Sequence, residues 1–156
     1  MHPRAEEFAE RARERHGFDP DVHEFDEGTK TAAEAVGCSV AQIASAIAVR
    51  AGEDLVVCLT SGANRVDMAA VAAARGVPEG SVGMADADRI RGTLGWSIGG
   101  VPPFCHDEDV PVFMDEALVG FEEVWAAAGT PQAVFPIDPE RLRELSGARV
   151  LALAEA

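Results

Sequence analysis

Short helical and strand-like segments follow one another irregularly along this chain, and this order restricts the folds it can adopt. Helical periodicity and helix-boundary residues predict helices over 3–16, 31–36, 66–75, 86–94, 121–128 and 138–145. Apolar alternation and short apolar runs predict strands over 22–25, 46–50, 55–59, 110–114, 133–137 and 150–153. Regular β-α-β repetition is missing, so we predict an α+β fold with a mixed sheet rather than a doubly wound one.

Proline and glycine mark several of the expected boundaries. Pro3 suits the first turn of a helix and Gly17 its stop, while Asp138-Pro139 is an N-cap followed by proline at the first helical position. The segment 51–54 separates two strand-like runs and predicts a β-hairpin with a four-residue turn.

The 156 residues are enough for one domain, and we expect a single domain over 1–156. No apolar run reaches the roughly 18 residues of a membrane-spanning helix. The first residues are charged and lack the apolar stretch of a secretion signal. The three cysteines form no C-x-x-C pair, so a disulfide framework or zinc ribbon is not expected. Together these features predict a cytoplasmic protein.

Acidic residues outnumber basic ones by 27 to 13, which gives a formal net charge of −14. An acidic chain with a single lysine suits a salt-rich cytoplasm, because about 1 M salt screens charge repulsion beyond about 3 Å. On this halophilic interpretation, thermal stability falls as salt is removed. A GC-rich genome, which favours arginine and alanine, is the alternative source of the composition. So negative a surface disfavours DNA and other polyanions, except at a small basic pocket.

A loop rich in glycine and proline runs through Gly99, Gly100, Val101, Pro102 and Pro103. Glycine lets a ligand approach the backbone closely, and proline fixes the dihedral angles around it. Such a loop can hold backbone N–H groups toward a carbonyl or an oxyanion. A plain structural turn is the alternative interpretation of this segment.

His106 follows this loop and precedes three acidic residues. A histidine beside carboxylates is a candidate general base or metal ligand. No paired Cys/His or H-E-x-x-H spacing accompanies it, so we expect no metal site and no cofactor. The sequence also lacks the G-x-S-x-G, Walker A and G-x-G-x-x-G patterns, which argues against serine hydrolases, P-loop proteins and dinucleotide-binding proteins.

Arg65 lies in a polar segment, Gly62 to Asp67, before a predicted helix. Its guanidinium is a candidate partner for a phosphate. The alternative is an Arg–Asp pair at the start of the helix.

The order of seven segments along the chain is more specific than any one of them. They are Gly28-Thr29-Lys30-Thr31-Ala32, Val40-Ala41-Gln42-Ile43, the hairpin, Asn64-Arg65-Val66-Asp67, Ile98 to Phe104, Met114 to Leu118 and Val124 to Pro131. This order resembles the YbaK/prolyl-tRNA-editing family of free-standing aminoacyl-tRNA deacylases, which also occur as an insertion in bacterial prolyl-tRNA synthetases. The resemblance extends from about Val22 to Leu153.

The resemblance implies a mixed, partly barrel-like sheet surrounded by helices. It also implies hydrolysis of the ester between a wrong amino acid and the 3′ adenosine of tRNA. The loop from Gly99 to Pro103, with Gly100, Val101 and Pro102, matches the family's glycine-proline loop around the ester. Thr29 and Thr31 match a polar segment that borders the pocket. Asp115 matches an acidic residue that orients the loop or the substrate amine.

One position departs from the family pattern. Relatives carry a lysine, implicated in catalysis or substrate anchoring, in an Ile-Val-Lys-Ser/Thr-Leu stretch, and here Ser45 occupies its position. A neutral hydroxyl does not supply the attraction of a cation for a phosphate or oxyanion. Lys30 is the first candidate substitute, followed by Arg65 and His106. A solvated loop residue is the alternative for Lys30.

Two functions of different class follow from this comparison. The first is a trans-editing deacylase, with Ser45, Gly100, His106 and Asp115 as catalytic candidates. Its substrate-binding candidates are Thr29, Lys30, Thr31, Arg65, Gly99, Val101, Pro102 and Pro103. The second is a family member without catalysis that holds a small ligand or an RNA end. For both, the expected partner is the 3′ end of aminoacyl-tRNA, without membrane or DNA, and the sequence leaves open which amino acid is removed.

Overall fold

The structure is a computed structural model that describes residues 1–26 and 31–155. Its α-helices are α1 (Pro3–His16), α2 (Ala32–Val36), α3 (Met68–Arg75), α4 (Ala87–Leu94) and α5 (Pro139–Ser146). Its strands are β1 (His23–Glu24), β2 (Ile43–Ala51), β3 (Asp54–Ser61), β4 (Val82–Met84), β5 (Val112–Asp115), β6 (Val124–Ala127), β7 (Ala133–Ile137) and β8 (Arg149–Leu151). Short 3-10 helices are η1 (Val40–Gln42), η2 (Glu79–Ser81) and η3 (Glu116–Gly120).

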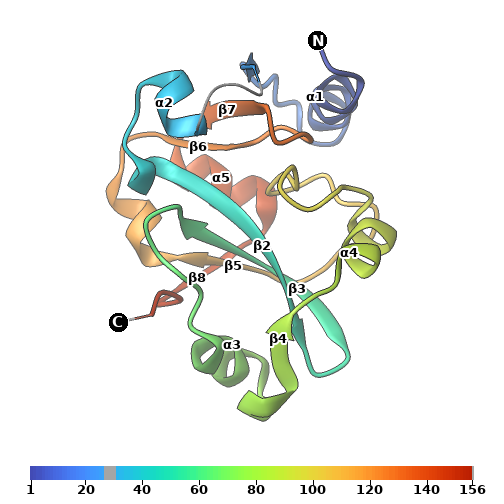
Figure 1. Cartoon of the computed structure of the whole chain (residues 1–156), viewed down its shortest axis with the longest axis vertical. Helices are drawn as coiled ribbons and strands as arrows, with labels where there is room; N and C mark the ends of the chain where they lie inside the picture. Colours follow the sequence, from blue (N-terminus) through green and yellow to red (C-terminus); the bar gives the residue numbers. More distant parts are fainter. Residues whose placement is uncertain (27–30, 156) are drawn as a thin grey trace.

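Within the described residues, eight strands form one mixed sheet in the order β1-β7-β6-β2-β3-β5-β8, with β4 paired to β2. The pairs β2–β6, β3–β5 and β5–β8 are parallel, and the others are antiparallel. Helices lie around this sheet, with α1 beside β7 at one end and α3 beside β4 at the other (Figure 1). The predicted α+β class with a mixed sheet is confirmed.

The hairpin of β2 and β3 is the centre of the sheet and divides two hydrophobic clusters. Side chains alternate across a strand, so Leu55, Val57 and Leu59 of β3 pack into the larger cluster. Val56 and Cys58 pack on the opposite face, in a smaller cluster with Val71 of α3. The strands are longer than predicted, and the turn shrinks to Gly52-Glu53, with Gly52 at φ +64°.

Helix α1 has the predicted bounds and covers the larger cluster. Its buried face carries Ala5, Phe8, Ala9 and Ala12. The ring centroid of Phe8 lies 5.1 Å from that of Phe135 and 5.5 Å from that of Phe104. Helix α1 is therefore packed directly on the segment that follows the glycine-proline loop.

The helix predicted over 121–128 is wrong, because this segment contains strand β6. Val124 and Ala126 are buried, whereas Trp125 and Ala127 are half-buried, which is the alternation of a strand. Pairing with β2 and β7 on its two edges outweighs the helix propensity of the three alanines. Strand β4, also absent from the prediction, has only three residues. None of the helices in the described part of the chain is long and apolar enough to cross a membrane.

Candidate functional site

Strand β2 has an open edge in the middle of the sheet. On this side it pairs with β6 only through Ile43 and Ala44, and with β4 only from Val49 onward. The carbonyl of Ala48 accepts a hydrogen bond from the Ala85 N–H at 3.3 Å. In a strand, the N–H and C=O of one residue point to one edge, and those of the next residue point to the other edge. The N–H and C=O of Ala46 therefore face the same open edge as the Ala48 carbonyl. The sheet therefore presents backbone donors and acceptors in the gap between β6 and β4.

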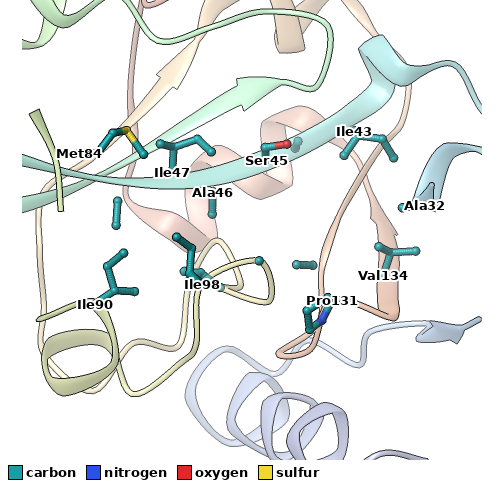
Figure 2. A pocket seen from close by; sticks show the side chains of 15 residues that line it. Ala32, Ile43, Ser45, Ala46, Ile47, Met84, Ile90, Ile98, Pro131 and Val134 are labelled. Atoms are coloured by element: carbon teal, nitrogen blue, oxygen red, sulfur yellow. The ribbon is translucent and has the colours of Figure 1, made fainter. Parts of the chain in front are cut away.

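A cavity of about 300 Å³ lies at this open edge. Its walls are aliphatic, and among the described residues that line it Ser45 carries the only polar side chain. Figure 2 shows Ala46 of β2 facing Ile98, with Pro131 and Val134 on another wall. The lining residues are Ala32, Ile43, Ala44, Ser45, Ala46, Ile47, Ala48, Met84, Ile90, Ile98, Gly99, Val101, Ala127, Pro131 and Val134.

The glycine-proline loop forms one side of this cavity through Gly99 and Val101. Gly99 has φ +89°, a left-handed conformation that favours glycine. Gly100 is buried against Thr130, and a Cβ added to Gly100 would lie 2.7 Å from the Thr130 Cα. Only glycine lets the two backbones approach this closely, so Gly100 fixes the distance between the loop and the turn after β6.

A second, wider cavity of about 500 Å³ lies on the other side of β2. Ser45, Ile47 and Met84 line both cavities. The rest of the second cavity contains several polar side chains among apolar ones. It is lined by Thr60 and Ser61 at the end of β3 and by Gly62, Asn64, Arg65, Val66, Met68 and Glu155. Ser45 is half-buried, and it therefore stands at the junction between an aliphatic cavity and a polar one.

A family model of the aminoacyl-tRNA editing domain matches residues 26–145. The chain belongs to the aminoacyl-tRNA editing domain family. Its family therefore places this chain in tRNA editing, and the predicted resemblance is confirmed.

Two similar solved structures extend over essentially the whole editing domain. One, described as a candidate trans-editing enzyme for prolyl tRNA synthetase, is 35% identical with a TM-score of 0.93, covering 100% of this chain and 99% of that chain. The other, from work on computational grafting of epitopes onto scaffold proteins, is 36% identical with a TM-score of 0.91 and the same coverage. The Bacillus subtilis protein YwhH is 28% identical over 134 residues, 83% of each chain.

The structure brings together some of the predicted site residues of the editing domain. Ser45, Gly99 and Val101 line the aliphatic cavity, and Gly100 lies directly behind its wall. Arg65 lies in the second cavity, which meets the first at Ser45. Within the described residues, Arg65 and Asp67 form no ion pair. Asp67 nevertheless caps the start of α3, where its carboxylate accepts the Ala69 N–H at 3.0 Å.

His106 does not line the cavity that contains Ser45. It is buried in a separate small cavity beside Arg15 and His16. Its Nε2 lies 2.8 Å from the Pro102 carbonyl oxygen, which only accepts hydrogen bonds, so Nε2 carries the proton and donates. Burial lowers the pKa of His106, with a smaller lowering from Arg15. His106 therefore holds the glycine-proline loop from behind instead of facing the cavity.

We expect His106→Phe to destabilise the editing domain by about 1–3 kcal/mol, because it leaves the buried Pro102 carbonyl without a donor. His106→Gln keeps a donor and serves as the matched control. The lowered pKa means that the unfolded chain binds the extra proton first, so stability falls as pH drops below about 6.5. Urea unfolding at several pH values should show a smaller loss of stability at low pH in His106→Gln than in wild type. An identical pH profile in the two proteins would show that His106 is not the source of the loss.

The other predicted residues lie around the site or outside the described part. Asp115 is buried at the end of β5, where its Oδ1 accepts the Leu153 N–H at 2.9 Å. Asp115 lines neither cavity, and it ties the C-terminal segment to the sheet. Thr31 caps α2 by accepting the Glu34 N–H, next to Ala32 in the cavity wall. Pro102 and Pro103 are buried, whereas Thr29 and Lys30 lie outside the described residues.

Sequence reasoning missed the aliphatic residues that shape the cavity. Met84 and Ile98 line the mouth of the cavity. Their side chains are 57% and 58% exposed, which is a high exposed fraction for large apolar residues. Ile98 lies directly before Gly99, so its place beside the glycine-proline loop is the signal in the sequence that could have found it. Met84 had no such signal, because β4 is too short to be recognised. In residues 1–26 and 31–155, no group of three or more His, Cys, Asp or Glu side chains is placed to hold a metal ion.

Proposed function

We propose that this editing domain is a trans-editing deacylase, which hydrolyses the ester bond of mischarged tRNA. The observation that carries the proposal is the aliphatic cavity at the open edge of β2, bordered by Ser45 and Gly99, in a chain of the editing family. The expected partner is the 3′ end of an aminoacyl-tRNA.

The aliphatic cavity is suited to the side chain of the wrong amino acid. Its lining offers apolar contacts but few groups that could pair with a buried charge. Among the described residues that line it, Ser45 alone has a polar side chain. We therefore expect amino acids with small or medium aliphatic side chains to be removed, and charged ones to be spared. The open mouth between Met84 and Ile98 leaves a path for the rest of the substrate.

The reaction needs little from the protein, because an aminoacyl ester is already activated. A water adds to the ester carbonyl carbon, the bond from that carbon to the ribose oxygen breaks, and the proton lost by the water ends on the departing oxygen. The products are a free amino acid and the tRNA 3′ end. In this proposal, the backbone N–H groups of Gly99, Val101 and Ala46 stabilise the negative charge on the carbonyl oxygen. The Gly100 N–H already donates to the Ser97 carbonyl at 3.0 Å.

Several residues would act through position rather than by touching the reacting atoms. Gly100 sets the approach of the loop to Thr130, and His106 holds the Pro102 carbonyl. Asp115 would keep the C-terminal segment beside the sheet through Leu153. The reaction rate depends strongly on the position of the loop, because a displacement of about 1 Å can slow a reaction about 100-fold.

A second candidate is a member of the family that binds the tRNA end without hydrolysing it. The observation that favours it is Ser45, which stands where relatives carry a lysine. None of the described residues lining the aliphatic cavity is charged, so no described cation there replaces that lysine.

Deacylation of a panel of mischarged tRNAs at molar salt separates the two candidates. We expect release of aliphatic amino acids and no release of charged ones. Ala46→Leu fills the cavity and should abolish the activity, whereas Ala117→Leu, at an exposed position in η3, is the matched control. Binding of charged tRNA without hydrolysis of any member of the panel would support the second candidate.

A further inference from the structure

We propose that helix α1 holds the glycine-proline loop in the position that deacylation needs, with Arg11 and Arg15 as positioning residues. This inference rests on the proposed function, in which backbone N–H groups of the loop stabilise the carbonyl oxygen. Helix α1 lies before residues 26–145, which match the family model, so the match itself gives this helix no function. Neither arginine lines the aliphatic cavity, so both would act through the loop rather than on the substrate.

Two arginines on one side of α1 donate to the backbone where the loop ends. Arg11 and Arg15 are four positions apart in the helix, so their side chains extend from the same face. The Arg11 Nη1 donates to the Cys105 carbonyl at 3.2 Å, and the Arg15 Nη1 donates to the His106 carbonyl at 2.9 Å. A hydrogen bond from a charged donor is stronger than one from a neutral donor. Cations of one helix thus hold two consecutive carbonyl groups.

The backbone at the loop end has a conformation that needs support. Cys105 has φ +67°, a left-handed conformation that residues other than glycine rarely adopt. Its carbonyl also accepts the Trp96 indole N–H at 3.0 Å, so Arg11 and Trp96 fix the same group. Such a conformation persists only where the surrounding structure determines it. The next residue, His106, donates to the Pro102 carbonyl, so α1 supports the residue that holds the loop from behind.

Helix α1 also contacts the turn after β6, which lies against the loop. A Cβ added to Gly129 would lie 2.7 Å from the Arg4 carbonyl oxygen, so the start of α1 touches this turn directly. The next residue, Thr130, is the close backbone neighbour of Gly100. One helix therefore contacts the end of the loop and the turn that packs on its middle, and a displacement of α1 would move both.

The side chain of Arg11 is fixed by its own neighbours. Its guanidinium forms ion pairs with Glu7 and Asp107, both at 2.9 Å. Its Cζ lies 5.0 Å from the centroid of the Trp96 ring, and the side chain is 22% exposed. A side chain that is already ordered loses little further entropy when it donates to a carbonyl. Arg11 is therefore suited to hold the Cys105 carbonyl in one place.

The loop end has room to move if Arg15 is removed. A small cavity of about 140 Å³ is lined by residues of α1, the loop end and α5, including Arg15 and His106. Without the hydrogen bond from Arg15, His106 can shift into this space and draw the Pro102 carbonyl with it. The loop N–H groups meet a charge that develops only in the transition state. The shift should therefore lower kcat more than it raises KM.

Steady-state deacylation of an aliphatic aminoacyl-tRNA tests the two arginines. We expect the double variant Arg11→Ala, Arg15→Ala, assayed where urea unfolding shows it to be folded, to lower kcat about tenfold with KM within about twofold of wild type. If this variant does not fold, Arg15→Ala alone should lower kcat about threefold. Arg13→Ala is the matched control with unchanged kcat, because its exposed side chain pairs with Asp19 at 3.1 Å, away from the loop.

A conservative pair of variants separates a positioning role from a general loss of stability. Each guanidinium uses one nitrogen, Nη1, for its carbonyl, so a lysine can supply the same charged donor. The double variant Arg11→Lys, Arg15→Lys should keep kcat within about threefold of wild type. A lysine pair as slow as the alanine pair, or a folded alanine pair with the kcat of Arg13→Ala, would overturn the proposal.

A double-mutant cycle with Gly100→Ala shows whether Arg15 acts through the loop. Gly100→Ala displaces the loop from the turn after β6, so little correct positioning is left for Arg15 to protect. Adding Arg15→Ala to Gly100→Ala should therefore lower kcat by less than about twofold more. Fully additive effects on kcat would show that Arg15 acts by another route and would also overturn the proposal.

NMR amide shifts separate this inference from the proposed function, because they require no hydrolysis. Arg15→Ala should shift the amides of Gly99, Gly100 and Val101, whereas Arg13→Ala should leave them at their wild-type positions. If no aminoacyl-tRNA is hydrolysed and these amides shift, the deacylase fails and the support of the loop by α1 stands. If hydrolysis proceeds while the amides and kcat of Arg15→Ala stay at wild-type values, the support fails and the deacylase stands.

Discussion

Gly100→Ala is expected to slow deacylation about 100-fold or more, because it moves the loop that borders the aliphatic cavity. The added Cβ would lie 2.7 Å from the Thr130 Cα and 2.9 Å from the Thr130 nitrogen. Both are backbone atoms, so a flexible side chain cannot move aside to make room. The loop and the turn after β6 must separate, at a cost in stability of about 1–3 kcal/mol. Single-turnover deacylation and urea unfolding measure the two effects.

Gly120→Ala is the matched control for this substitution. It adds the same methyl group in η3, where no atom would lie within 4 Å of the new Cβ. Its stability should stay within about 0.5 kcal/mol of wild type, and its activity should be unchanged. A Gly100→Ala protein with wild-type kcat/KM would show that the loop position does not govern the reaction.

Local signals in the sequence predicted those elements whose boundaries are set by local chemistry. Helix α1 begins at Pro3 and ends before Gly17 at φ +62°, as the proline and glycine indicated. Helix α5 begins after Asp138, whose side chain accepts the Glu140 N–H. In both cases the signal lies within one turn of the boundary, where the end groups of a helix need partners.

Elements that depend on distant pairing were not predictable in this way. The segment Val124–Ala127 is a strand because β2 and β7 pair with its two edges. For the same reason, nothing local in 43–51 shows that β2 is left open between Ala44 and Val49, which is where the aliphatic cavity forms.

The candidate site likewise contains residues that local sequence signals indicated and residues that only the fold brings together. The loop residues Gly99 and Gly100 were recognisable from their composition and from the family resemblance, and they border the cavity. His106 is only three positions from Pro103, yet its ring turns to the Pro102 carbonyl on the other side of the loop. Nearness in sequence therefore did not predict the side of the loop on which His106 lies. The polar second cavity gathers residues from β2, the turn after β3, β4 and the C-terminal segment, and only the fold brings these together.

Ser45→Lys is expected to raise deacylation about 100- to 1,000-fold, because a preorganised charge at a developing oxyanion contributes about 2.7–4 kcal/mol. Ser45 is half-buried at the junction of the two cavities, and the second cavity offers room for the longer side chain. By contrast, Ser45→Ala removes one neutral hydrogen-bonding group, worth about 0.5–1.5 kcal/mol, and should slow the reaction about tenfold at most. Single-turnover rates on an aliphatic aminoacyl-tRNA compare the three proteins.

The matched control is Ala117→Lys, which adds the same positive charge at an exposed position that lines neither cavity. It separates local stabilisation of the oxyanion from a general improvement in RNA binding by a less acidic protein, which would raise both variants alike. A gain confined to Ser45→Lys means that the wild-type site lacks a cation at the ester and works through its backbone donors. If Ser45→Lys and wild type hydrolyse a good substrate at the same rate, charge at this position does not limit the reaction. The glycine-proline loop and a bound water must then carry it alone.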